Sequence, residues 1–312
     1  MLDPTKQQQP NKMKLKHLKN YLCATILVAA TSAMATTRSV PSQYSTISAA
    51  VAAAANGDTI SIANGTYTEQ VVVGRSQANL TFIGASQTGV ILQAGENQIA
   101  MVINGTNILV EYMTIRNTYA SGSTSSHAVM LYGGKIEFYR CYINGMQDTL
   151  GVWYGPYYFS YCEIRGEEDF IYSGGPAYFS TCNIRQMNTT GGCNAAPSTP
   201  QGTPFGIVFY GCTVCRASGV ADNSSTLMRP WYPYGETAYI NCSMDSHITA
   251  VCWDDNGHAS TARGAEYGSK TLAGATISLS SRPSWVVRLT AAQVASSYSQ
   301  STVLGGWTPP IP

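Results

Sequence analysis

The chain has 312 residues, of which 11% are charged, with 29 glycines, 20 tyrosines and a formal net charge of +1. This composition is typical of a turn-rich β protein and argues against a disordered chain or a coiled coil. Five of the 18 basic residues and one of the 17 acidic residues lie in the first 35 positions, so the remainder carries a net charge of −3. The mature chain therefore offers no basic surface for a nucleic acid.

The first 35 residues predict a secretory signal peptide. Four lysines between positions 12 and 19 precede a short apolar segment at residues 21–30, and Ala-Met-Ala at residues 33–35 has the pattern of a cleavage site. The apolar segment is too short to span a bilayer, so we expect a secreted, extracellular protein with no membrane partner. Removing Cys23 leaves eight of the nine cysteines, and six Asn-x-Ser/Thr sequons suit an exported glycoprotein.

The rest of the chain, residues 36–312, reads as one β-rich domain. Alanine-rich residues 44–55 predict a short helix, which we place as an N-terminal cap. Short alternating segments separated by Gly and Asn predict strands at residues 59–63, 65–69, 71–73, 80–83, 90–92, 101–103 and 108–115. Residues 187–204 and 254–275 are predicted as polar loops. We expect the tail at residues 284–312 to pack across the outside of the domain.

A repeat dominates the middle of the chain: an aromatic residue stands three positions before a cysteine, and an apolar residue two positions after it. The copies are Phe138/Cys141/Ile143, Phe159/Cys162/Ile164, Phe179/Cys182/Ile184, Phe209/Cys212/Val214 and Tyr239/Cys242/Met244. A repeat of 20 to 30 residues with short β segments predicts a β-helix. The repeated cysteines are expected either as an internal ladder of small side chains or as disulfides between stacked neighbours, and Cys193 and Cys215 make a plausible bridge.

Three polar residues share the period of this repeat. His127, Asp148 and Asp169 follow one another at intervals of 21 residues, each beside a strand-like segment. Since neighbouring strands lie about 4.8 Å apart, residues one coil apart become close neighbours. We therefore expect these three side chains to stack.

Four motifs in this region resemble the pectin methylesterases, a family of secreted carbohydrate esterases. Gln-Asp-Thr-Leu at residues 147–150 matches the central signature of that family. Gly-Thr-Tyr-Thr-Glu at 65–69 resembles its Gly-x-Tyr-x-Glu motif, Asp-Phe-Ile at 169–171 its Asp-Phe-Ile-Phe-Gly segment, and Leu-Met-Arg-Pro-Trp at 227–231 its Leu-Gly-Arg-Pro-Trp. The order and approximate spacing agree over nearly the whole mature chain. The resemblance implies an all-β fold, a single-stranded right-handed parallel β-helix with long loops on one side.

The resemblance also implies a role for each matching residue. Asp169 is the expected nucleophile, which forms an acyl-enzyme with the substrate carboxyl, and Asp148 the expected acid and base. Since neighbouring carboxylates resist double ionisation, we expect Asp148 to stay protonated, while Arg229 holds Asp169 ionised through a bidentate pair. Gln147 is the expected oxyanion donor. The side chains assigned to substrate binding are Trp231, Tyr172 and Phe170.

Two departures from the family pattern concern the same site. His127 stands where the family has a glutamine that donates to the oxyanion, and a histidine can also donate. Glu168 stands where a valine is common. Strand alternation predicts that Glu168 points opposite to Asp169, into the interior, where an unpaired carboxylate is costly.

The resulting prediction is a monomeric pectin methylesterase that needs no cofactor or metal and acts on methylated homogalacturonan in the plant cell wall. Two alternatives remain open. One is a pectin-binding β-helix with weakened or lost catalysis, which the departures at His127 and Glu168 motivate. The other is a pectin-active β-helix enzyme of another class, such as a lyase or glycosidase.

Overall fold

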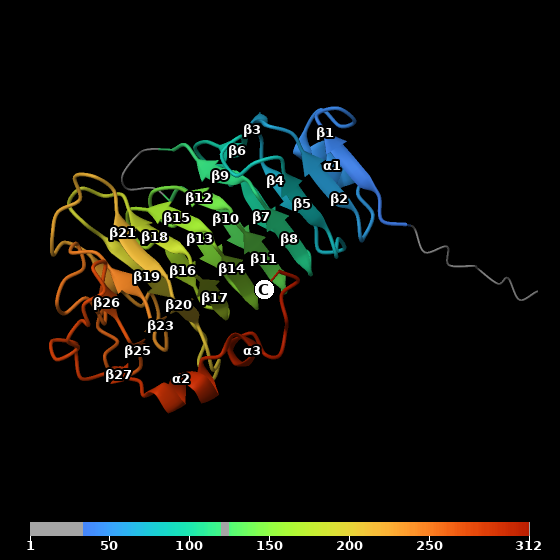
Figure 1. The fold of residues 1–312 in the computed structure, drawn as a ribbon. Coiled ribbons are helices and arrows are strands. Elements are labelled where there is room, and N and C mark those ends of the chain that lie inside the picture. Colours follow the sequence, from blue (N-terminus) through green and yellow to red (C-terminus); the bar gives the residue numbers. More distant parts are fainter. Residues whose placement is uncertain (1–33, 120–124, 312) are drawn as a thin grey trace, which may run out of the picture. The chain divides into compact units, whose positions relative to one another are not determined.

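The structure is a computed structural model that describes residues 34–119 and 125–311. These residues form a parallel β-helix in which three sheets run along the stack of coils (Figure 1). The predicted fold is confirmed. The predicted signal peptide lies outside the described residues, apart from its last two, Met34 and Ala35.

Neighbouring strands within each of the three sheets pair in parallel. The eleven-stranded sheet has the order β1 (Thr37–Val40), β2 (Thr59–Ile62), β5 (Thr81–Gly84), β8 (Ile108–Glu111), β11 (Ile136–Tyr139), β14 (Tyr157–Ser160), β17 (Ala177–Ser180), β20 (Ile207–Tyr210), β23 (Glu236–Ile240), β25 (Arg263–Tyr267) and β27 (Val286–Arg288). The nine-stranded sheet has the order β3 (Gly65–Thr68), β6 (Val90–Ala94), β9 (Thr114–Asn117), β12 (Tyr142–Asn144), β15 (Glu163–Gly166), β18 (Asn183–Gln186), β21 (Thr213–Arg216), β24 (Ser243–Met244) and β26 (Lys270–Thr271). The seven-stranded sheet has the order β4 (Val71–Val73), β7 (Met101–Ile103), β10 (Val129–Leu131), β13 (Leu150–Val152), β16 (Ile171–Ser173), β19 (Cys193–Pro197) and β22 (Thr226–Met228).

A single left-handed residue at one corner of each coil explains the aromatic–cysteine repeat. The residue before the cysteine has a φ of +50° at Arg140 and +53° at Tyr161, and Gly211 has +62°. Side chains of a strand alternate between its two faces. A left-handed residue interrupts that alternation, so an aromatic ring and a thiol three positions apart both point inward.

The inward side chains stack from coil to coil. The rings of Phe138, Phe159 and Phe179 lie 5.2 and 4.4 Å apart between centroids, and the column continues through Phe209 to Tyr239 at 4.9 and 4.5 Å. All of them are fully buried. Contacts of this kind contribute about 0.5–1.5 kcal/mol each beyond the area that they bury.

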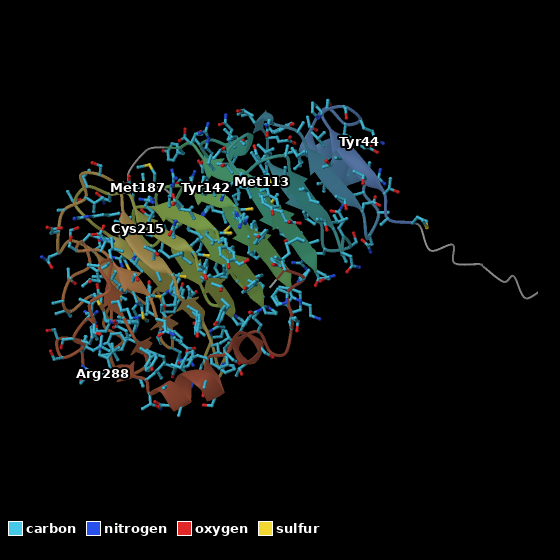
Figure 2. The ribbon with its side chains drawn as sticks, viewed as in Figure 1. Tyr44, Met113, Tyr142, Met187, Cys215 and Arg288 are labelled. Atoms are coloured by element: carbon cyan, nitrogen blue, oxygen red, sulfur yellow. The ribbon has the colours of Figure 1, made fainter. Side chains whose placement is uncertain are left out.

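The cysteines form the predicted internal ladder, and none of the eight in the described residues is in a disulfide. Met113, labelled in Figure 2, is buried in the coil before the first cysteine of the ladder. The predicted bridge between Cys193 and Cys215 is wrong. Both residues lie in strands, β19 and β21, and these strands belong to different sheets.

The predicted N-terminal cap is confirmed as α1 (Ile47–Ala53), which contacts β1, β2 and β4 (Figure 1). Its apolar face buries Ile47 and Val51. The carboxylate of Glu69 accepts hydrogen bonds from the backbone N–H groups of Ile47 and Ser48, both at 2.9 Å. Because the first N–H groups of a helix lack partners within the helix, Glu69 fixes the cap to the first coil.

The tail packs across the outside of the domain, as predicted. Helices α2 (Ala291–Ser297) and α3 (Gln300–Val303) follow β27, and Val294, Val303 and Leu304 join a cluster with Tyr158 and Tyr178 on the outer face of the eleven-stranded sheet. The two predicted loops are wrong in part. The first contains β19 and the second contains β25 and β26, and the side chains of β19 are all buried.

The tail also covers a carboxylate that points outward from β11. Glu137 is fully buried, and one of its oxygens accepts a hydrogen bond from the Ile311 N–H at 3.2 Å. Burial raises the pKa of Glu137 from 4.5 to about 7, although the Ile311 N–H opposes the rise. Between these two pH values Glu137 is therefore protonated in the folded chain and ionised in the unfolded chain.

This proton makes the stability of the fold depend on pH. The contribution of Glu137 is complete below about pH 4.5 and is lost as the pH rises to about 7. We expect the melting temperature of Glu137→Gln, relative to that of the wild type, to be higher at pH 8 than at pH 4.5. The reason is that the amide keeps the acceptor for the Ile311 N–H without carrying a charge. Thermal unfolding from pH 4 to 8 measures this, with the exposed Glu96→Gln as a control. A wild-type-to-variant difference that is constant with pH contradicts it.

Candidate active site

The predicted stack of His127, Asp148 and Asp169 is present. In the seven-stranded sheet Val129 pairs with Leu150, which pairs with Ile171, and each of the three polar residues lies two positions before one of these partners. The backbone N–H of Asp148 donates to the Glu168 carbonyl at 3.2 Å. Two carboxylates thus occupy equivalent positions in adjacent coils, at the edge of the same sheet.

The two aspartates share an unusual backbone conformation, which corrects the prediction for Glu168. Asp148 has a φ of +56° and Asp169 a φ of +48°, both in the left-handed region. The expected strand alternation is therefore interrupted, and Glu168 lies on the same side as Asp169. Its side chain is 31% exposed, and its carboxylate oxygen lies 2.7 Å from Nη2 of Arg229. Glu168 is a third carboxylate in the site, not a buried unpaired one.

Arg229 follows β22 and contacts both acids of this pair through one nitrogen. Nη2 donates to Asp169 Oδ2 at 2.5 Å, and the same atom contacts Glu168. The Arg229 Nε and the second Asp169 oxygen, Oδ1, are buried with no hydrogen-bond partner in the described residues. The predicted bidentate pair is therefore not formed, because Glu168 takes part of the guanidinium.

Two opposing effects act on the ionisation of Asp169 and Glu168: burial raises the pKa of each carboxyl, and the positive charge of Arg229 lowers it. Burial raises the pKa of the Asp169 carboxyl; Arg229 opposes this rise, and the charge of Asp148 adds to it. The pKa of Glu168 is also raised, first by burial and then by Asp169. Burial disfavours the charge on Arg229, yet its bond to Asp169 keeps its pKa above the usual value. Arg229 thus favours the ionised form of Asp169, and the expectation that it holds Asp169 ionised stays a prediction.

His127 holds the backbone of Asp148 and does not contact its carboxylate. Nδ1 lies 2.8 Å from the carbonyl oxygen of Asp148. Since a carbonyl only accepts hydrogen bonds, Nδ1 carries the proton in this contact. The hydroxyl of Tyr172 lies 3.1 Å from the same nitrogen and donates to Met130 Sδ at 2.7 Å. Burial raises the pKa of Tyr172, and the charge of Asp148 adds to the rise, so its hydroxyl stays a neutral donor.

The remaining predicted polar residue, Gln147, is half-buried, and its side-chain amide makes no hydrogen bond to the part of the chain that the structure describes. It lies directly before Asp148. The carboxylate of Asp148 is also half-buried and accepts a hydrogen bond from the Ser125 hydroxyl. The amide and this carboxylate are therefore both accessible to a bound molecule.

A cleft of about 210 Å³ adjoins Asp148 on the outer face of the seven-stranded sheet. It is lined by Asp148, Trp153, Tyr172, Ala196, Ser198, Trp231 and Tyr232. Trp231 is 55% exposed and Tyr232 is 60% exposed. Trp231 and Tyr172, which were both predicted to bind substrate, line this cleft, where a ligand can reach them. The prediction for Phe170 is wrong, because its ring is fully buried in the core.

Sequence reasoning missed Trp153 and Tyr232. The signal for Trp153 was present, since strand alternation from Gly151 places residue 153 on the same outer face. Its ring meets that of Tyr172 edge-on, at 6.1 Å between centroids. Tyr232 follows Trp231 in a loop, where alternation gives no guidance.

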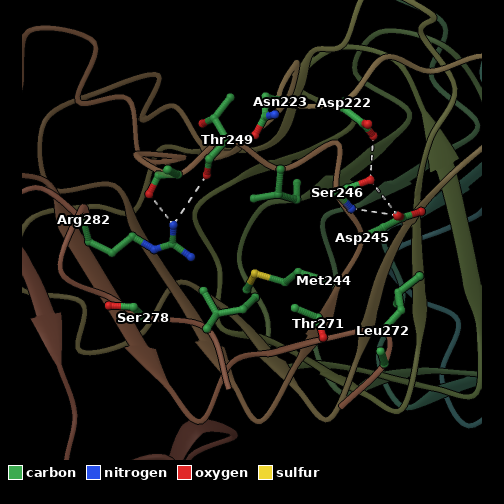
Figure 3. A pocket seen from close by; sticks show the side chains of 14 residues that line it. Asp222, Asn223, Met244, Asp245, Ser246, Thr249, Thr271, Leu272, Ser278 and Arg282 are labelled. Carbon is green, nitrogen blue, oxygen red and sulfur yellow. Dashed lines mark hydrogen bonds between the residues drawn. The ribbon is translucent and has the colours of Figure 1, made fainter. Parts of the chain in front are cut away.

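A second cavity, of about 500 Å³, contains none of the predicted site residues (Figure 3). Its one basic side chain, Arg282, is paired with Glu266 at 2.8 Å and donates to the Ala250 carbonyl at 2.5 Å. Within residues 34–119 and 125–311, no cluster of three or more His, Cys, Asp or Glu side chains is arranged to hold a metal ion. No helix of these residues is long and apolar enough to cross a membrane.

Comparison with known proteins identifies the family. The Pectinesterase family model matches residues 33–306. The chain belongs to the pectinesterase family. It is 31% identical to pectinesterase A of Dickeya dadantii, over 86% of this chain and 89% of that protein. It is 30% identical to pectinesterase 2 of Citrus sinensis, over 67% of this chain but only 44% of the length of that relative.

A solved structure supports the same fold for this chain. The crystal structure of a pectin methylesterase in complex with a hexasaccharide superposes with a TM-score of 0.75 at 29% identity, and covers 91% of this chain and all of that one. The parallel β-helix of this chain is therefore shared with an enzyme that was crystallised with an oligosaccharide.

One glycine, Gly151, leaves the room that the Tyr172 ring occupies. A Cβ at Gly151 would lie 2.6 Å from Met130 Sδ and 2.8 Å from the Tyr172 hydroxyl. We expect Gly151→Ala to push the Tyr172 ring towards the cleft and to lower the free energy of unfolding by about 1–3 kcal/mol, as overpacking does. Urea unfolding and a crystal structure of the variant measure both effects. Gly74→Ala is the control, since its Cβ would meet only Gln77 Oε1 at 3.7 Å. An unmoved Tyr172 at wild-type stability contradicts the prediction.

Proposed function

We propose that this protein is a pectin methylesterase that hydrolyses methyl esters of homogalacturonan to carboxylate and methanol, with Asp169 as the nucleophile. The observation that carries the proposal is the stack of two carboxylates in adjacent coils, one of them held by Arg229. Family membership supports the reaction class.

The first half of the reaction makes an acyl-enzyme. The Asp169 carboxylate attacks the ester carbonyl carbon. The negative charge that develops on the carbonyl oxygen is met by the free amide of Gln147. As the C–O bond to the methoxy group breaks, Asp148 transfers its proton to that oxygen, and methanol leaves. The product is an anhydride between Asp169 and the uronic acid.

The second half restores the enzyme. Asp148, now a carboxylate, takes a proton from water, and the hydroxide attacks the anhydride carbonyl. The bond to the Asp169 oxygen breaks, which leaves Asp169 as a carboxylate and Asp148 protonated, and the uronic acid that forms gives its proton to the solvent. Asp148 suits this double role, because it is half-buried and beside the cleft, whereas Asp169 is 1% exposed.

The aromatic cleft supports a sugar polymer as substrate. The exposed ring of Trp231 and the rings of Trp153 and Tyr232 line the space next to Asp148. Flat apolar faces of this kind pack against the C–H faces of sugar rings, while a few polar groups fix orientation. The related pectin methylesterase bound to a hexasaccharide is consistent with such a substrate.

The setting of the reaction is part of the proposal. We infer that the protein is a secreted, glycosylated monomer that acts on pectin in the plant cell wall. The support is the signal-like composition of residues 1–35 and the six sequons of the chain.

The reaction is tested by methanol release from highly methylated pectin. We expect release by the wild type, also with a calcium chelator present, and a loss of at least about a thousandfold in Asp169→Asn, because an amide cannot form the acyl-enzyme. Glu167→Gln, a neighbouring acid that does not contact Arg229, is the matched control. A folded wild-type protein that binds pectin without releasing methanol would support the alternative of a non-catalytic binder.

His127 is expected to act by holding Asp148 through a donated hydrogen bond. Replacement by glutamine keeps a donor, so we expect His127→Gln to retain kcat within about tenfold. His127→Leu removes the donor and should lose substantially more, about the 10²-fold that misplacement of a catalytic group costs. Initial rates of methanol release at saturating pectin compare the two. Equal rates for the leucine and glutamine variants would remove the hydrogen bond from the mechanism.

A further inference from the structure

Glu168 has no role in the proposed reaction, yet both oxygens of its carboxylate make contacts in the site. Its carboxylate lies between the Arg229 Nη2, at 2.7 Å, and the Cys193 N–H, which donates to Oε2 at 3.3 Å. Gly192 leaves room for it, because a Cβ there would lie 2.9 Å from Oε2. The side chain is thus held on both of its oxygens.

Three charged side chains act on Glu168: those of Asp169, Asp148 and Arg229. Asp169 lies next to it in the chain, Asp148 stands one coil earlier, and Arg229 is the one cation that pairs with it among the described residues. From β19, the coil that follows, it meets the backbone N–H of Cys193 and the buried Cys193 thiol, whose own pKa is raised, chiefly by burial. One guanidinium nitrogen therefore serves two carboxylates, with a third nearby.

We propose that Glu168 is a positioning residue that sets the pH at which Asp169 becomes a nucleophile, by competing with it for Nη2 of Arg229. The expected effect on reaction kinetics rests on the proposed function, whereas the expected effect on the ionisation of Asp169 does not. An ionised Glu168 takes part of the hydrogen-bonding capacity that would otherwise stabilise the Asp169 carboxylate, and it adds a like charge beside it. Both effects make Asp169 harder to ionise, so the nucleophile is formed at higher pH than it would be with Arg229 to itself.

The same charge acts on the product. Hydrolysis leaves a uronate carboxylate at the carbon that was bonded to Asp169, so this anion arises beside the nucleophile. An ionised Glu168 then repels the product and favours its release, and the site discriminates against uronates that already lack the methyl group.

The test has two independent readouts on the full folded chain. The first is the titration of the Asp169 side-chain carboxyl, followed by carbon NMR with labelled aspartate and assigned with Asp169→Asn. The second is the pH dependence of kcat/KM for methanol release, together with inhibition by demethylated oligogalacturonate. The variants are Glu168→Gln and Glu168→Val, with Glu167→Gln as the control that removes a neighbouring charge without touching Arg229.

In both Glu168 variants we expect the Asp169 titration and the acidic limb of kcat/KM to move to lower pH by about one unit, and the oligogalacturonate to inhibit more strongly. The Glu167 control should move neither. An Asp169 titration that is unchanged in both variants, with only the melting temperature lowered, would overturn the proposal and leave Glu168 a structural residue. Since NMR needs no turnover, an inactive wild type would overturn the proposed function while the electrostatic test of Glu168 still stands.

Discussion

The stacking of coils in a fixed register is the constraint on which the rest of this structure depends. Each coil must close with the same residues above one another, since its strands have partners only in the coils before and after it. One left-handed residue per corner, such as Arg140 or Tyr161, makes this possible, because it lets the aromatic ring and the thiol of the repeat point inward together. A shift by one residue would expose the whole inner column of rings.

The same register builds the candidate site from residues that are far apart in the chain. Asp148 and Asp169 meet because they occupy one position in adjacent coils, and Arg229 reaches Asp169 from two coils beyond it. Both aspartates stand at left-handed positions, where the chain leaves the regular strand alternation. The corner geometry that closes each coil thus also directs the carboxylates to the outer face, beside the aromatic cleft.

The ionisation of the carboxyl groups at this site depends on a single positive charge, that of Arg229. Three carboxylates lie together, and in the described residues the one basic side chain that pairs with any of them is Arg229, which contacts Glu168 and Asp169. Burial makes every negative charge there costly, so the way in which the guanidinium is divided between Glu168 and Asp169 determines which of them ionises first. The fold supplies the position of each acid, and the single arginine favours the ionised form of the two acids that it contacts.

The sequence by itself determined the architecture and most of the site. The aromatic–cysteine repeat is periodic, and periodicity reports which side chains share a column, so the β-helix and the stack of His127, Asp148 and Asp169 followed from spacing. The capping helix followed from the alanine-rich composition of residues 44–55. What spacing does not report is the local backbone conformation. The left-handed φ of Asp169 turned Glu168 towards Arg229, against strand alternation, and broke the predicted bidentate pair. Burial likewise placed Phe170 in the core, and sheet membership separated Cys193 from Cys215. These outcomes depend on contacts between coils, which only the tertiary structure decides, because the partner of each residue lies some twenty or more positions away in the chain.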